Sequence, residues 1–167
     1  ATYSVAILPE VEARLDGARE RIALTAGHSL GEFAALTIAG ALPFEEGLRL
    51  VRRRGEAMRD AGRDAPGGMA AIIGLDTEEV QSILTEVCAD NGGEGVWLAN
   101  DNCPGQIVIA GQQKALKRAM TLAETEGARR VIPLKVSVAC HTPYMRSAAE
   151  ALGTALEETT FQEPWVP

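Results

Sequence analysis

The strongest structural signal in the sequence is Gly27-His28-Ser29-Leu30-Gly31-Glu32. The apolar residues 21–26 before it predict a short buried strand, and residues 30–39 predict a helix. A serine between two glycines at a strand-to-helix turn is the arrangement of a nucleophile elbow, which exposes the serine oxygen beside the unpaired N–H groups of the first helical turn. The pattern Gly-x-Ser-x-Gly at residues 27–31 also arises by chance in loops, so its interpretation depends on the rest of the chain.

Length and charge restrict the classes of protein to which the chain can belong. Its 167 residues, 46% hydrophobic and 23% charged, suffice for an ordinary globular domain with a real core. The net charge of −7 argues against nucleic acid or a membrane surface as a partner, because phosphate groups are bound by clustered positive charge. No apolar run approaches the roughly 18 residues that a membrane helix needs, and the sequence has no signal peptide.

Cysteine and histidine usage argues against a metal site. Cys88, Cys103 and Cys140 are odd in number and form no Cys-x-x-Cys pair, which disfavours a disulfide framework or a zinc site and fits a reducing cytoplasm. The chain has only two histidines, so a His-rich metal site is not available. We predict neither a metal nor a cofactor. It opens without a methionine and stops as though a strand were beginning, and we expect it to be a segment of a longer protein.

The order of predicted elements gives an α/β fold in two parts. Helices are predicted at residues 2–16, 30–39, 44–61 and 143–158. After a loop at residues 61–68, the predicted order is β-α-β-β-α-β, the order of a ferredoxin-like unit. Its strands are expected at residues 69–75, 96–99, 106–110 and 129–138, and its helices at 77–91 and 112–127. Thr77 is the expected cap of the first of these helices, and residues 100–105 are expected to form a hairpin loop.

Arg54 differs from its neighbouring arginines on the predicted helix 44–61. Leu50 and Val51 lie one turn before it and Met58 one turn after it, so Arg54 lies on the apolar stripe. An arginine that faces the interior must meet an anion, because an unpaired buried charge is very costly. That anion is either a carboxylate of the same protein or a substrate carboxylate held by two parallel hydrogen bonds.

A serine nucleophile needs a base, and His141 is the better of the two candidates. His28 directly precedes Ser29, and at a strand end its side chain should point away from the serine. His141 follows another predicted strand, and strand ends converge at one edge of an α/β sheet. The alternative is that His141 only caps the next helix. Cys140 should face away from His141 and contribute to a pocket or the core.

Several motifs together resemble malonyl-CoA:acyl carrier protein transacylases and the related acyltransferase domains of fatty acid and polyketide synthases. Residues 27–32 resemble the family's active-site signature, and residues 51–55 (Val-Arg-Arg-Arg-Gly) resemble the helix whose arginine lies 25 positions after the serine. Residues 68–75, 100–111 and 136–141 resemble the start of the small subdomain, its Asn-x-Asn-x-Pro-Gly-Gln hairpin and the strand that ends in the catalytic histidine.

The resemblance implies a fold and a reaction. It implies an incomplete α/β-hydrolase-like acyltransferase core at residues 1–64 and 135–167, whose parallel sheet carries the serine turn, and a ferredoxin-like subdomain at residues 65–134. It implies that malonyl-CoA and acyl carrier protein are the partners. The roles that it implies are nucleophile for Ser29, base for His141, oxyanion donor for the Leu30 N–H, and substrate binding for Arg54, His28, Asn100 and Asn102.

The chain also departs from this family. It lacks the family's N-terminal segment with the second oxyanion donor and the C-terminal part that completes the sheet, so we expect residues 1–167 alone to be poorly stable and nearly inactive. Cys140 stands where several malonyl-selective relatives have phenylalanine. Two other functions remain open, a serine hydrolase or thioesterase with the same turn and a non-catalytic part of a synthase.

Overall fold

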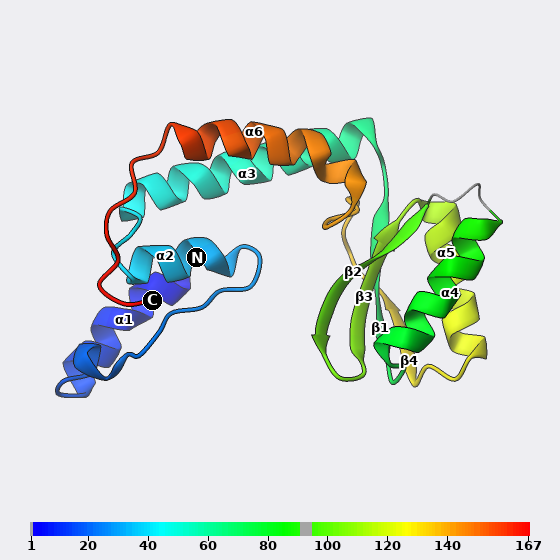
Figure 1. Cartoon of the computed structure of the whole chain (residues 1–167), viewed down its shortest axis with the longest axis horizontal. Helices are drawn as coiled ribbons and strands as arrows, with labels where there is room; N and C mark the ends of the chain where they lie inside the picture. The colour runs from blue at the N-terminus through cyan, green and yellow to red at the C-terminus, as the bar shows by residue number, and fades with distance from the viewer. Residues whose placement is uncertain (1, 91–94) are drawn as a thin grey trace. The chain divides into compact units, whose positions relative to one another are not determined.

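The computed structural model of the chain describes residues 2–90 and 95–167 (Figure 1). The chain forms two compact units, the first made of Ala1–Glu56 and Ala151–Pro167 and the second of Ala57–Glu150. We describe each unit by itself. No helix among the described residues is long and apolar enough to cross a membrane.

The first unit is helical. It contains α1 (Thr2–Arg14, with Pro9 inside), the short 3-10 helix η1 (Arg19–Arg21) and α2 (Gly31–Ile38), together with parts of α3 (Phe44–Asp64) and α6 (Arg146–Glu157). Its core forms where apolar residues of α2, α3 and α6 meet, because each of these helices presents one apolar stripe. The buried members of this core are Phe33, Leu42, Leu50 and Ala155.

The end of the chain lies against the C-terminal end of α2. Backbone N–H groups of Gln162 and Trp165 donate to the carbonyls of Ala41 (2.9 Å) and Ala39 (3.0 Å). The Trp165 indole Nε1 donates to the carbonyl of Ile38 at 2.8 Å. The bonds to Ile38 and Ala39 satisfy carbonyls that the end of a helix leaves without a partner. We call residues 162–167 the C-terminal strap.

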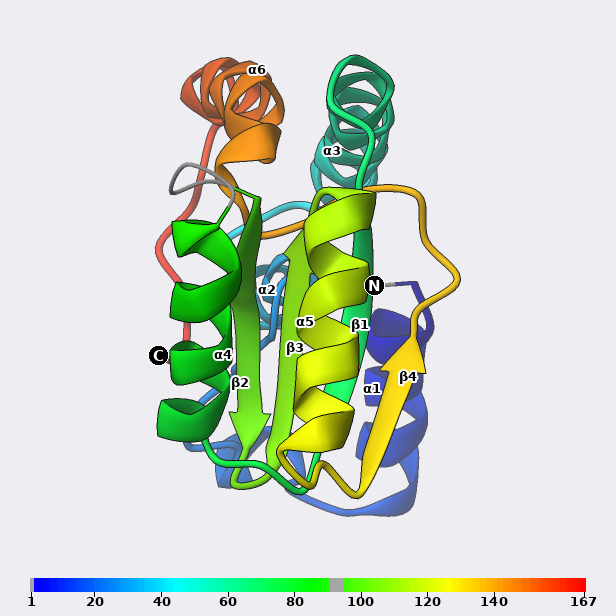
Figure 2. The ribbon, with the colours of Figure 1, turned by 90° about the vertical axis from the view of Figure 1, so that its right-hand side faces the viewer.

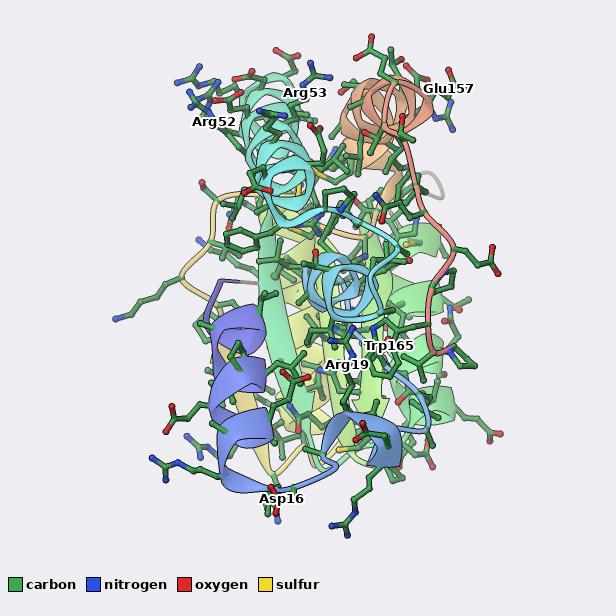
Figure 3. The ribbon with its side chains drawn as sticks, turned by 90° about the vertical axis from the view of Figure 1, so that its left-hand side faces the viewer. Asp16, Arg19, Arg52, Arg53, Glu157 and Trp165 are labelled. Carbon is green, nitrogen blue, oxygen red and sulfur yellow. The ribbon has the colours of Figure 1, made fainter. Side chains whose placement is uncertain are left out.

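Trp165 also contacts the segment that precedes the serine turn. The Arg19 guanidinium lies over the Trp165 ring, with 4.7 Å between its carbon and the ring centre (Figure 3). The Thr25 N–H donates to the carbonyl of Pro167 at 2.8 Å. The strap therefore joins both ends of the segment that contains the serine turn and α2.

The described residues do not form the predicted strand at residues 21–26. Ile22 is extended, but residues 22–26 belong to no helix or strand, no strand occurs in the described part of the first unit, and Leu24 is 63% exposed. A strand requires a neighbouring strand with which it exchanges a series of hydrogen bonds. The parallel sheet that we expected around Ser29 is therefore not found among the described residues.

The second unit is a four-stranded antiparallel sheet with two helices on one face (Figure 2). Its elements follow the predicted order, and the strands are arranged as β2-β3-β1-β4. The core between sheet and helices forms because alternate strand residues face α4 and α5. The elements are β1 (Gly68–Ile73), α4 (Thr77–Ala89), β2 (Val96–Cys103), β3 (Gln106–Gly111), α5 (Gln113–Thr125) and β4 (Arg130–Pro133).

Element boundaries in this unit differ from the prediction at three places. The cap of α4 is Asp76 and not Thr77, because the Asp76 carboxylate accepts from the Glu79 N–H at 2.9 Å while the Glu79 carboxylate accepts from the Asp76 N–H at 2.7 Å. The hairpin loop is shorter than residues 100–105, because β2 continues to Cys103. The last strand ends at Pro133 instead of residue 138.

The other face of the sheet is covered by the segment that follows β4. Met69, Val108 and Ala110 point to this face and pack against Ala139, which is fully buried. Tyr144 packs edge-on against the ring of Trp97, with 5.1 Å between ring centres. The segment around residue 141 is therefore held on the sheet through apolar contacts on both of its sides.

Candidate active site

Ser29 lies in a strained turn. Its φ is +52°, in the left-handed region that residues with a side chain seldom adopt. Two hydrogen bonds close the turn, from the Gly31 N–H to the His28 carbonyl at 2.9 Å and from the Glu32 N–H to the Ser29 carbonyl at 3.2 Å. Left-handed non-glycine residues cluster at functional sites, and a nucleophile elbow requires this conformation.

The two glycines of the turn have different reasons to be glycine. A Cβ on Gly27 would lie 2.1 Å from the carbonyl carbon and oxygen of Gly31 and 2.3 Å from the nitrogen of Glu32. The backbone at Gly27 therefore lies directly against the first turn of α2. A Cβ on Gly31 would have no neighbour within 4 Å among the described residues. Only Gly27 is required by close approach.

Arg54 contacts the candidate nucleophile. Its guanidinium Nη2 donates a hydrogen bond to the Ser29 Oγ at 2.9 Å, in a partly buried environment. In the described part of the chain, no carboxylate forms an ion pair with Arg54, whereas Arg52 and Arg53 each pair with a glutamate. The contact places a fixed positive charge next to the oxygen that would carry an acyl group.

The two preceding arginines are used differently. Arg52 donates to Glu56 at 2.9 Å, and Arg53 donates to Glu158 at 2.9 Å; both arginines are exposed (Figure 3). The hydrogen bond with Glu56 raises the pKa of Arg52. The contrast follows from helix geometry, since residues on successive positions of α3 point in different directions. Arg54 therefore points toward the serine while its neighbours form surface ion pairs.

The Leu30 N–H directly follows Ser29 at the start of α2. Leu30 precedes α2, and its φ of −59° and ψ of −28° are already helical. Within residues 2–90 and 95–167, this N–H donates no backbone hydrogen bond, whereas those of Gly31 and Glu32 are used within the turn. Its role as an oxyanion donor next to Ser29 stays a prediction.

His141 belongs to the second unit and, like Ser29, is one of the two described non-glycine residues in the left-handed region. Its φ is +59°. It does not follow a strand directly, contrary to the prediction, but lies in a turn before the 3-10 helix η2 (Pro143–Met145), which precedes α6. Thr142 caps this helix and Pro143 is its first residue, an arrangement typical of a Thr-Pro pair at a helix start. Ser29 and His141 thus share an uncommon backbone conformation.

The remaining predicted residues are distributed over both units. His28 belongs to the serine turn of the first unit, while Asn100 and Asn102 lie on β2 of the second. Asn100 is half-buried and Asn102 exposed. Cys140 packs with the apolar residues on the face of the sheet opposite α4 and α5, and Cys88 donates to the Val96 carbonyl at 3.4 Å. The sequence did not identify Thr142, which bonds across the turn of His141, or Trp165, which contacts residues on both sides of the serine turn. The Thr-Pro pair was a usable signal for Thr142.

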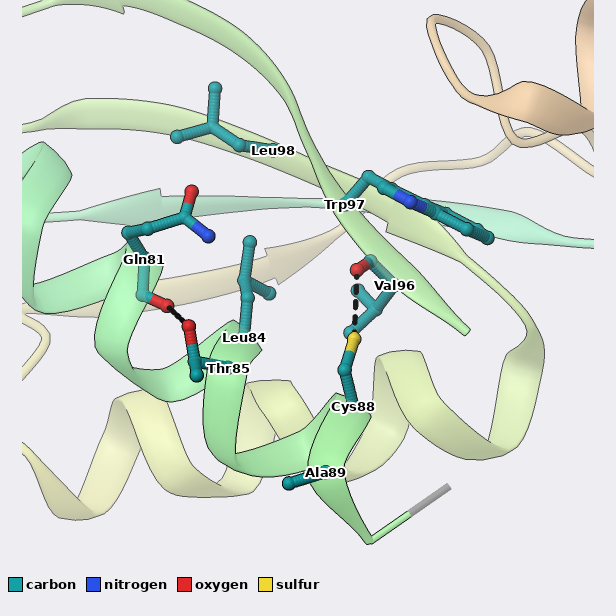
Figure 4. A pocket seen from close by; sticks show the side chains of 8 residues that line it. All are labelled: Gln81, Leu84, Thr85, Cys88, Ala89, Val96, Trp97 and Leu98. Carbon is teal, nitrogen blue, oxygen red and sulfur yellow. Dashed lines mark hydrogen bonds between the residues drawn. The ribbon is translucent and has the colours of Figure 1, made fainter. Parts of the chain in front are cut away.

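Two further features of the described residues bear on ligand binding. No group of three or more His, Cys, Asp or Glu side chains within residues 2–90 and 95–167 is placed to hold a metal ion. A groove of about 540 Å³ lies between α4 and β2 (Figure 4). Its lining contains none of the predicted site residues, so the groove is not assigned to the chemistry of Ser29. It is lined by Gln81, Leu84, Thr85, Cys88, Ala89, Val96, Trp97 and Leu98.

The serine turn, the arginine at the serine oxygen and the antiparallel subdomain define a class of acyl-transferring proteins. Residues 14–167 match the family model of the acyl transferase domain, and the chain belongs to this family. It is 46% identical to the malonyl CoA-acyl carrier protein transacylase of Bacillus subtilis over 143 residues, which cover 86% of the chain and 44% of that relative. It is 44% identical to the corresponding protein of Salmonella typhimurium, over 87% of the chain and 46% of the relative.

Solved structures agree with this assignment. The malonyl-transacylase in a complex with its type II polyketide synthase acyl-carrier protein is similar with a TM-score of 0.89 and 41% identity, over 98% of the chain and 51% of that protein. The malonyl CoA-acyl carrier protein transacylase of Coxiella burnetii also gives a TM-score of 0.89, at 42% identity and 50% coverage of that protein. The chain thus spans about half the length of the relatives that it matches.

Proposed function

We propose that this chain carries the reactive serine of a malonyl-CoA:acyl carrier protein transacylase that acts in fatty acid or polyketide synthesis. The observation that carries the proposal is the 2.9 Å hydrogen bond from Arg54 to the Ser29 oxygen. A malonyl group on Ser29 ends in a carboxylate, and a guanidinium next to the ester oxygen is within reach of that carboxylate. The names of two relatives add support, since both are malonyl CoA-acyl carrier protein transacylases.

The proposed reaction has two halves. His141 removes the proton of Ser29, which attacks the thioester carbon of malonyl-CoA. The Leu30 N–H donates to the oxyanion, and His141 protonates the departing coenzyme A thiolate. In the second half, His141 deprotonates the phosphopantetheine thiol of acyl carrier protein, whose sulfur attacks the malonyl ester. The ester bond to Ser29 breaks, and His141 returns the proton to the Ser29 oxygen.

Substrate binding is proposed to involve four residues. Arg54 binds the malonyl carboxylate, and His28, Asn100 and Asn102 contact other parts of the substrate. No cofactor is needed, because acyl transfer between a thioester and a hydroxyl is redox-neutral. We also propose a cytoplasmic location, which the odd number of cysteines favours.

The finer fold is part of the proposal. We infer that residues 22–26 form a strand of an α/β-hydrolase-like parallel sheet when further strands pair with them, which the 63% exposure of Leu24 supports. The strand order β2-β3-β1-β4 supports a ferredoxin-like subdomain. The domain boundaries at residues 64/65 and 134/135 remain predictions.

The test is labelling of Ser29. The full-length protein is incubated with radioactive malonyl-CoA, quenched and digested, and the labelled peptide is identified; Ser29→Ala is the control. We expect one labelled peptide that contains Ser29 and loses its label on addition of the thiol form of acyl carrier protein. Sustained hydrolysis without carrier protein would indicate a hydrolase or thioesterase instead. Absence of label from a folded protein would indicate a non-catalytic part of a synthase.

A further inference from the structure

The turn that carries His141 requires an external constraint. With a φ of +59°, His141 occupies a backbone region that glycine adopts freely and other residues do not. Such a conformation persists only where the surrounding structure fixes it. The neighbouring residues therefore decide where the imidazole of His141 points.

Thr142 supplies this constraint through its hydroxyl group. The Oγ1 donates to the carbonyl of Ala139 at 2.6 Å and accepts from the N–H of Tyr144 at 3.3 Å. The first bond spans the turn that contains His141, and the second fixes the helix that follows. Thr142 is only 9% exposed, so water does not readily replace either bond.

Both residues joined by this hydroxyl are held on the sheet. Ala139 is fully buried against Met69 and Val108, and a Cβ on Gly67 would lie 2.8 Å from the Ala139 Cβ. Tyr144 packs on Trp97 of β2. Thr142 therefore connects two points of the segment that apolar contacts have already fixed, and His141 lies between these two points.

We propose that Thr142 is a positioning residue for His141. Its hydroxyl holds the turn in the left-handed conformation that aims the imidazole, and it takes no part in proton transfer. The proposal rests on the proposed role of His141 as base. Removal of the hydroxyl should lower kcat for malonyl transfer and leave KM for malonyl-CoA nearly unchanged, because misplacement of a catalytic group affects the chemical step.

The test compares Thr142→Val with Thr142→Ser in the full-length protein. Valine keeps the shape and loses the hydroxyl, and serine keeps the hydroxyl. We expect Thr142→Val to lower kcat by about tenfold to a hundredfold, and Thr142→Ser to recover most of this loss. Thr159→Val is the matched control, since the half-buried Thr159 hydroxyl also donates to a backbone carbonyl, that of Ala155, at 2.8 Å. This control should leave kcat within about twofold.

A double-mutant cycle separates positioning from a purely structural role. If Thr142 acts through His141, Thr142→Val should cause no further loss of kcat in a His141→Ala background. Equal losses in both backgrounds, or a rise in KM without a change in kcat, would overturn the proposal. Full activity of His141→Ala would instead refute the proposed base and leave the function to be revised. Far-UV circular dichroism of every variant confirms that it is folded.

Discussion

Substitution of the two glycines of the serine turn should have opposite effects on stability. In Gly27→Ala, the new methyl group would lie 2.1 Å from the backbone of Gly31, much closer than the roughly 3.5 Å at which carbon atoms pack. Neither backbone segment can move without opening the turn, so we expect a loss of about 3 kcal/mol, at the upper end of the cost of overpacking. In Gly31→Ala, the methyl group meets nothing within 4 Å, and alanine in the first turn of α2 should gain up to about 1 kcal/mol.

The assay uses tryptophan fluorescence during urea unfolding. The chain has two tryptophans, and Trp97→Phe leaves Trp165 as the reporter of the first unit. In this background the two glycine variants should differ by about 4 kcal/mol in unfolding free energy, with Gly27→Ala the less stable. Equal midpoints for the two variants, or a destabilised Gly31→Ala beside an unaffected Gly27→Ala, would refute the reasoning.

Three more predictions concern strain, selectivity and pH. Because the φ of Ser29 is +52°, Ser29→Gly should be more stable than Ser29→Ala by about 1 kcal/mol in urea unfolding, the reverse of the usual order; a more stable alanine variant would contradict the strain. In the full-length protein, Arg54→Ala should lose malonyl transfer and gain relative acetyl transfer, while Arg53→Ala should keep the selectivity of the parent; unchanged selectivity of Arg54→Ala in a competition assay would exclude Arg54 as the carboxylate ligand. The hydrogen bond from Arg59 lowers the pKa of Asp60, so Asp60 contributes stability above its unfolded pKa and loses it as pH falls through the folded pKa; Asp60→Asn should reduce the decline of the urea midpoint in acid, and an unchanged pH profile would contradict this.

The order of elements in the second unit was predicted correctly from the sequence, because these strands and helices pack against one another. Every strand from β1 to β4 finds its neighbour within residues 57–150, so alternation of apolar residues was sufficient to predict the order. The apolar residues 21–26 gave a similar signal, but they form no strand in the structure, because a strand also needs a neighbouring strand. The cap of α4 was displaced by one residue because Asp76 and Glu79 form a reciprocal pair that outcompetes Thr77.

The candidate site was predictable where it depended on one helix or one turn. The position of Arg54 on the apolar stripe of α3 distinguished it from Arg53, and the structure pairs it with Ser29. The role of Thr142 was not predictable, since its hydroxyl connects Ala139 to Tyr144 through geometry that spacing does not encode. Trp165 was missed for the same reason, because its partners Arg19 and Ile38 are far away in the sequence.

The C-terminal strap has a consequence for the order in which the chain is made. The first unit is discontinuous, so its core, in which Phe33 and Leu50 pack with Ala155, cannot close until the ribosome has delivered residues 151–167. The second unit is continuous, and all four of its strands have been translated before residue 151 is added. Bringing the separated pieces together across residues 57–150 costs roughly 4 kcal/mol of chain entropy when this segment is unfolded, and less once it is compact. The serine turn is therefore translated early, but the contacts that hold it form late. They form once residues 151–167 exist and the second unit has folded between the two pieces of the first unit.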